Sequence, residues 1–108
     1  MSLVRVLSIG LALVAAAPAL AGEVQTPECQ RDLLVADSDV RMSQIKIAGK
    51  ATASTKELCP LWREHAAIAR KAGAIYKRCL TGTAQRVRTG DMSSMAADFD
   101  QAVATSCK

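Results

Sequence analysis

Apolar residues repeat at helical spacing in three segments of the chain, which predicts three main helices. Thr26 is typical of an N-cap and Pro27 of a first helical position, so the first helix should begin there and end near Gly49. Its apolar face, interrupted by a polar gap at Ser43 and Gln44, consists of Cys29, Leu33, Ala36, Val40 and Ile47.

The second segment has the most regular apolar repeat, but its start is ambiguous. Ser54 and Glu57 have the spacing of a capping box, which would place Pro60 inside the helix. A helix that begins at Pro60 itself is the alternative. Both options end near Leu80 and share an apolar face made of Leu61, Trp62, Ile68, Ala72, Ile75, Tyr76 and Cys79.

The third segment contains two turn-like tripeptides, Thr81-Gly82-Thr83 and Thr89-Gly90-Asp91. The second of them predicts a break, with Asp91 as the N-cap of the last helix. We therefore expect a short helix near 84–89 and a longer one near 92–106. The apolar stripe of the longer helix consists of Met92, Met95, Ala96, Phe99, Ala102, Val103 and Cys107.

The chain begins with a segment that is typical of a secretory signal peptide. Arg5 precedes an apolar run from Val6 to Ala17, which is shorter than the ~20 residues that a membrane span requires. Ala19-Leu20-Ala21 then places small side chains where a signal peptidase needs them. We therefore expect cleavage after Ala21, so that residues 1–21 form the leader and 22–108 one helical domain. We therefore expect an exported protein, periplasmic or extracellular, with no transmembrane segment in the mature chain.

Four cysteines in a short exported chain predict two disulfides, because a small apolar core needs covalent support. Cys59 and Cys79 flank one helix and lie about 30 Å apart at 1.5 Å per residue, so they cannot pair. Pairing Cys29 with Cys59 would require helix ends to reach across the bundle. An antiparallel three-helix, all-α bundle instead predicts the pairs Cys29–Cys79 and Cys59–Cys107.

The net charge is +4, and it is distributed unevenly. Residues 23–39 contain five acids and one cation, whereas residues 63–90 contain seven cations and one acid. This basic face either complements the acidic first helix or binds an anionic partner, such as an acidic protein or lipid head groups. Nucleic acid is not expected, because no aromatics interleave with the cations. The candidate binding surface consists of Arg63, Arg70, Lys71, Lys77 and Arg78.

No catalytic constellation is visible, so we expect no enzyme and no cofactor. His65 is the one histidine, without a neighbouring nucleophile or acid motif, and we expect a structural or partly exposed role for it. Met92 and Met95 could bind Cu(I) with Met42 or His65 as a further ligand, although a core role is the more common one for such a pair.

These observations favour a small exported, non-catalytic protein that binds an envelope partner. A periplasmic copper carrier that uses Met92 and Met95 is one alternative. A stress chaperone is another, by analogy with small disulfide-linked helical proteins.

Overall fold

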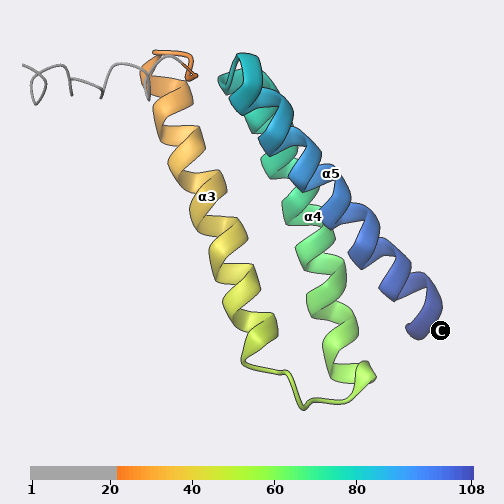
Figure 1. Ribbon diagram of the computed structural model, residues 1–108. Helices are drawn as coiled ribbons and strands as arrows, with labels where there is room; N and C mark the ends of the chain where they lie inside the picture. The colour runs from red at the N-terminus through yellow and green to blue at the C-terminus, as the bar shows by residue number, and fades with distance from the viewer. Residues whose placement is uncertain (1–21) are drawn as a thin grey trace, which may run out of the picture.

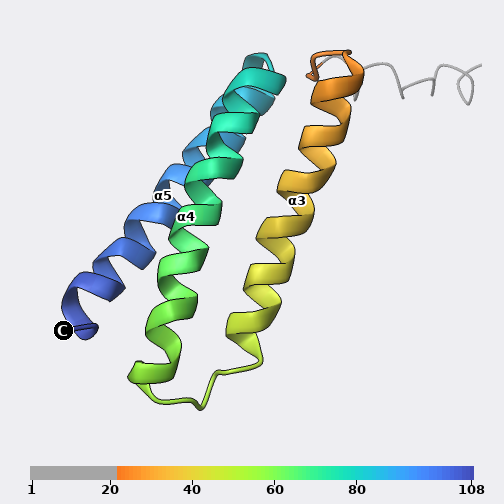
Figure 2. The same cartoon turned by 180° about the vertical axis from the view of Figure 1, so that it is seen from behind.

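The computed structural model describes residues 22–108, so the expected leader peptide lies outside the described residues. Three helices follow one another, α3 (Pro27–Ala48), α4 (Thr55–Cys79) and α5 (Gly82–Ser106). They alternate in direction, since α3 runs down, α4 up and α5 down in Figure 1, and α4 packs against both of the others. The view from behind shows the same order, with α3 and α5 at the two edges (Figure 2). The prediction of an all-α antiparallel three-helix bundle is confirmed.

Side-chain caps set the starts of the first two helices. The Cys29 amide donates to Thr26 Oγ1 at 3.1 Å, as the sequence predicts. The Glu57 amide donates to Ser54 Oγ at 3.4 Å, which places the start of α4 at Thr55 and Pro60 inside the helix. Pro60 is exposed and has no N–H to donate to the carbonyl four residues earlier, so α4 lacks one backbone hydrogen bond near its start.

The predicted break in the third segment is wrong, because α5 is continuous through Gly90. Inside the helix, the Thr89 hydroxyl donates to the Gln85 carbonyl at 2.6 Å instead of starting a turn. Arg88 and Met92 are held by neighbouring helices on both sides of the glycine. Such packing outweighs the ~1 kcal/mol that a glycine costs inside a helix. The turn that does form uses Gly82, whose φ of 60° suits glycine.

The core is built largely from small side chains. Five alanines are buried between the helices, and the largest fully buried side chains are Tyr76 and His65. Small residues allow helix axes to approach closely, but each contributes little buried apolar area. The five alanines are Ala36, Ala66, Ala69, Ala72 and Ala96.

Two disulfides cross-link the helix ends, and their pairing is the predicted one. Cys29 is bonded to Cys79 between α3 and α4. Cys59 is bonded to Cys107 between the start of α4 and the residue after α5. Such cross-links are typical of oxidising, exported environments. None of the helices described within residues 22–108 is long and apolar enough to cross a bilayer.

A short strap precedes α3 and pairs with the turn between α4 and α5. The Val24 amide donates to the Cys79 carbonyl, and the Thr81 amide donates to the Gly22 carbonyl, both at 2.9 Å. The strap therefore closes the same end of the bundle as the Cys29–Cys79 disulfide.

Candidate binding surface on α4 and α5

The five basic residues expected to form one surface lie in two rows on α4. Seven residues make almost two helical turns, so residues seven apart share a row. Arg63, Arg70 and Lys77 form one row, which borders α5, and Lys71 and Arg78 form the other, which borders α3.

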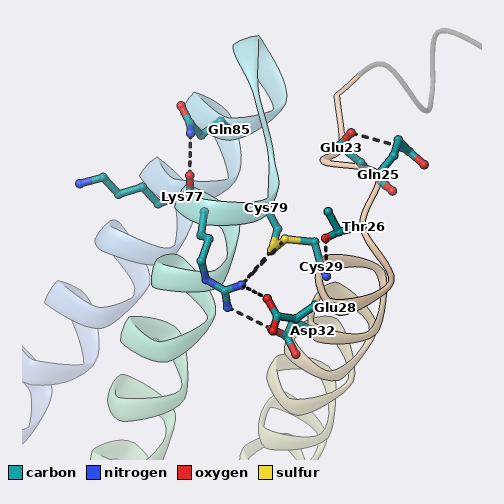
Figure 3. Close-up of a disulfide and its surroundings, with 10 residues drawn as sticks. Glu23, Gln25, Thr26, Glu28, Cys29, Asp32, Lys77, Cys79 and Gln85 are labelled. Carbon is teal, nitrogen blue, oxygen red and sulfur yellow. Dashed lines mark hydrogen bonds and ion pairs between the residues drawn. A yellow bond between two sulfur atoms is a disulfide. The ribbon is translucent and has the colours of Figure 1, made fainter.

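Arg78 belongs to the contact with α3. Its guanidinium lies 3.0 Å from Asp32 and 3.9 Å from Glu28. Figure 3 shows these two acids beside the Cys29–Cys79 disulfide. Nη1 also contacts the Cys79 sulfur at 3.5 Å. Complementing the acidic first helix is therefore the role that the structure gives to this cation. Lys71, in the same row, is exposed.

Arg70 and Lys77 line a groove of about 440 Å³ between α4 and α5. Its floor is apolar and made of small residues, with Met92 as the one large side chain. The two helices approach closely at Gly73, since a Cβ added there would lie 3.3 Å from the Met92 Cβ. The small residues that line the groove are Ala69, Gly73, Ala74, Ala96 and Ala97.

The groove continues toward the α4–α5 turn. A second cavity of about 430 Å³ shares Lys77, Thr89 and Ser93 with the first and extends to Gln85 and Arg86. The Gln85 side chain donates to the Lys77 carbonyl at 2.7 Å and so fixes this end of the rim. The two cavities form one groove, named here the α4–α5 groove.

The rim of the α4–α5 groove is positively charged. Arg70 pairs with Asp100 at 2.8 Å, but both side chains are more than half exposed, so the pair holds the rim weakly. Lys77 and Arg86 make no ion pair with any other residue of the described segment 22–108. The charge of these two side chains is available to an anionic partner.

Arg63, the first residue of its row along the chain, lies at the end of the bundle that contains the Cys59–Cys107 disulfide. It lines a separate cavity of about 500 Å³ beside the Cys59–Cys107 disulfide, together with Lys56 and Lys108. The five expected residues therefore do not form one surface: Arg70 and Lys77 line the groove, Arg63 lies beside the other disulfide, and Lys71 and Arg78 lie in the row that borders α3.

A polar cluster that sequence reasoning missed joins all three helices. Arg88 of α5 donates to Asp37 of α3 at 2.6 Å and to the Tyr76 hydroxyl of α4 at 2.7 Å, and Tyr76 also donates to Asp37. The Arg88 guanidinium also lies over the Tyr76 ring, 4.3 Å from its centroid. Burial, followed by the hydrogen bond to Asp37, raises the pKa of Tyr76, so the phenol stays protonated. The cluster is a structural tie between helices.

His65 is buried rather than partly exposed. Its Nδ1 shares a 2.7 Å hydrogen bond with Ser43 Oγ, and its ring meets Phe99 edge-on at 4.5 Å. Burial lowers the pKa of His65, which keeps the imidazole neutral. The structural role expected for this residue agrees with these contacts, and Ser43, which looked like a polar gap, is its partner.

The candidate copper ligands do not converge. Met92 packs at the level of Gly73, whereas His65 lies eight residues earlier on α4, about 12 Å along the helix. Met92 is buried in the core cluster and Met95 packs against it. Within residues 22–108, no three His, Cys, Asp or Glu side chains gather as a metal-binding group.

Comparison with family models, with curated proteins and with solved structures finds no match to this chain. Function is therefore inferred from the surface itself.

Proposed function

We propose that this chain is an exported, non-catalytic binding module, and that its α4–α5 groove takes an acidic amphipathic helix of an envelope protein. The observation that carries the proposal is the combination of an apolar floor of small residues with a cationic rim at Arg70, Lys77 and Arg86. A periplasmic location is part of the proposal, and it rests on the leader-like residues 1–21 together with two disulfides.

The shape of the groove favours a helix as its occupant. Small residues such as Gly73 and Ala97 leave room for an apolar helix face to lie between α4 and α5. Arg70 and Lys77 lie seven residues apart, about 10 Å along α4. A partner helix with carboxylates at the same seven-residue spacing would place one beside each cation.

The charges of the rim support recognition and speed of binding more than affinity. Exposed ion pairs each contribute at most about 1 kcal/mol, whereas a positive rim steers an acidic segment into place. The apolar floor would then supply most of the affinity as it is removed from water.

A designed peptide tests the proposal directly. Its helix carries alanine and leucine on one face and glutamates seven residues apart at the edge, and a matched peptide carries glutamines instead. We expect the acidic peptide to bind and the glutamine peptide to bind about tenfold more weakly, as measured by calorimetry at low salt.

Two variants locate the binding on the protein. Ala97→Trp fills the groove and should abolish binding, whereas Ala104→Trp, on an exposed site further along α5, should leave it unchanged. Lys77→Gln with Arg86→Gln should weaken binding. The control Lys56→Gln with Lys71→Gln removes the same amount of charge outside the groove and should leave binding unchanged. Equal binding of both peptides, or binding that survives Ala97→Trp, would refute the proposal.

One observation favours the chaperone alternative. His65 is buried where all three helices meet, so its protonation in acid would oppose the packing of the bundle. If acid exposes apolar surface and the protein then suppresses aggregation of a denatured client, this second function gains support. Aggregation that proceeds unchanged would exclude it.

A further inference from the structure

Helix α3 carries a second apolar row on the side that faces away from the core. Leu34, Val35, Met42 and Ile45 are 72%, 46%, 53% and 56% exposed. Leu34, Ser38, Met42 and Ile45 follow one another at steps of four, four and three residues, so they share a face of the helix. We call Leu34, Val35, Met42 and Ile45 the outer row.

The outer row is opposite the buried row of α3, which contains Cys29, Leu33, Ala36, Val40 and Ser43. At 100° per residue the two rows lie roughly on opposite sides of the helix. Since α3 occupies an edge of the bundle and packs against α4, no helix within residues 22–108 covers the outer row (Figures 1 and 2).

The charges of α3 are sorted between its faces. Arg31 and Arg41 flank the outer row, are exposed, and make no ion pair with another residue of the described chain. Three of the four acids of α3 are used toward α4 and α5, since Glu28 and Asp32 pair with Arg78, and Asp37 pairs with Arg88. The fourth, Asp39, is half-buried and is outnumbered by the two arginines beside the outer row. The outer face is therefore apolar and cationic.

We infer that the outer face of α3 binds the surface of a membrane that contains anionic phospholipid. An apolar row flanked by arginines on a helix that lies flat is the arrangement that partitions into the headgroup region. The row extends about 16 Å from Leu34 to Ile45, and Arg31 and Arg41 reach lipid phosphates while their stems cover apolar surface.

A second copy of the chain fits this face less well. A stable dimer buries about 800 Å² per partner, more than one row of four partly exposed side chains supplies. The twofold copy would also bring Arg31 and Arg41 against the same two arginines, with only the half-buried Asp39 of each copy to offset them. Charge complementarity therefore selects an anionic surface.

Vesicle sedimentation tests the inference. The protein is recovered after export, and its N-terminus is read by mass spectrometry, so that wild type and variants start at the same residue. Wild type should bind vesicles of phosphatidylglycerol mixed with phosphatidylcholine, bind pure phosphatidylcholine far less, and be released by salt.

Variants of α3 should lose this binding selectively. Leu34→Gln with Ile45→Gln should weaken it at least about tenfold, while Val87→Gln, which removes an equally exposed apolar side chain from α5, should not. Arg31→Gln with Arg41→Gln should weaken it about thirtyfold, at about 1 kcal/mol per arginine. Lys77→Gln with Arg86→Gln, in the α4–α5 groove, should leave it unchanged.

Several results would overturn the inference. They are an absence of sedimentation with anionic vesicles, binding that the α3 variants retain, and loss of binding in the groove variant alone.

Sedimentation velocity without lipid tests for a second copy as the occupant. A dimer that dissociates on Leu34→Gln with Ile45→Gln would assign the outer face to a second copy. If the protein does not bind vesicles but retains an acidic envelope protein, and the same substitutions abolish that retention, the outer face would be assigned to a protein partner. Because groove and outer face are changed separately, failure of one proposal is distinguishable from failure of the other.

Discussion

His65 of α4 and Ser43 of α3 share a hydrogen bond of 2.7 Å in the interior of the bundle, where both side chains are buried. The imidazole is thereby fixed between a hydroxyl and the Phe99 ring. Neither neighbour carries a charge that would stabilise an imidazolium, so the bundle is built around a neutral histidine.

Stability should therefore fall in mild acid. The folded protein lowers the pKa of His65 by burial, so the unfolded chain, with a pKa near 6.5, takes up the proton first. The part of the free energy of unfolding that depends on neutral His65 is fully present above about pH 6.5. It is lost as pH falls through that value toward the lower pKa of the folded protein. The slope should approach at most about 1.4 kcal/mol per pH unit.

Denaturant unfolding as a function of pH measures this effect. His65→Asn keeps a side chain that can bond Ser43 but does not titrate in this range, and its stability should change less between neutral and mildly acidic pH. A pH dependence identical to that of wild type would assign the acid sensitivity to carboxylates.

The tie between Asp37, Tyr76 and Arg88 should contribute measurably to stability. Asp37→Asn removes the charge that Arg88 contacts at 2.6 Å and weakens the acceptor of the Tyr76 hydroxyl. We expect a loss of about 1–2 kcal/mol, moderated because both charged side chains are partly exposed to water. Asp39→Asn, two residues later on the same helix, should cost less than about 0.5 kcal/mol.

Glycines 73 and 90 should respond oppositely to alanine. Nothing lies within 4 Å of a Cβ added at Gly90, so Gly90→Ala should stabilise α5 by about 1 kcal/mol. At Gly73 the added Cβ meets the Met92 Cβ at 3.3 Å, so the helices must separate and we expect a net loss of about 1 kcal/mol. Thermal midpoints of the two variants should shift in opposite directions, and a rise in both would show that α5 can shift without cost.

The two disulfides should differ in their resistance to reductant. Cys29 and Cys79 are 4% and 0% exposed, whereas Cys107 is only half-buried. Limited reduction followed by alkylation and mass spectrometry should label Cys59 and Cys107 first. Earlier labelling of Cys29 and Cys79 would instead indicate that the Arg78 guanidinium, 3.5 Å from the Cys79 sulfur, favours the thiolate. Each cross-link spans about 50 residues and should contribute about 4 kcal/mol.

Local sequence signals predicted the features that depend on one helix or on helix order. Thr26 and Ser54 cap the helices that they precede, and the up-down-up order was enough to pair Cys29 with Cys79. The helix break predicted at Thr89-Gly90-Asp91 was wrong because the turn preference of this tripeptide is worth less free energy than the packing of the residues beside it. Tertiary contacts decide such cases, and the tripeptide alone does not reveal them.

The binding surface was only partly visible in the sequence. The basic character of α4 was evident, but Arg78 and Lys77 are adjacent in sequence and lie on different sides of the helix. Which side meets α3 depends on the fold. The cluster of Asp37, Tyr76 and Arg88 draws one residue from each helix, and no spacing within a single segment could have indicated it. The exposed row on α3 did leave a signal, since Leu34, Met42 and Ile45 repeat at helical spacing away from the main apolar face.

The covalent loops closed by Cys29–Cys79 and Cys59–Cys107 overlap along α4. A single peptide-bond cut anywhere between Cys29 and Cys107 leaves two pieces that are still joined by at least one disulfide. A cut in the exposed connection near residue 52, for example, leaves the first piece tethered through Cys29. In an oxidising, exported environment, where chaperones that use ATP are absent, a nicked molecule would keep its three helices together.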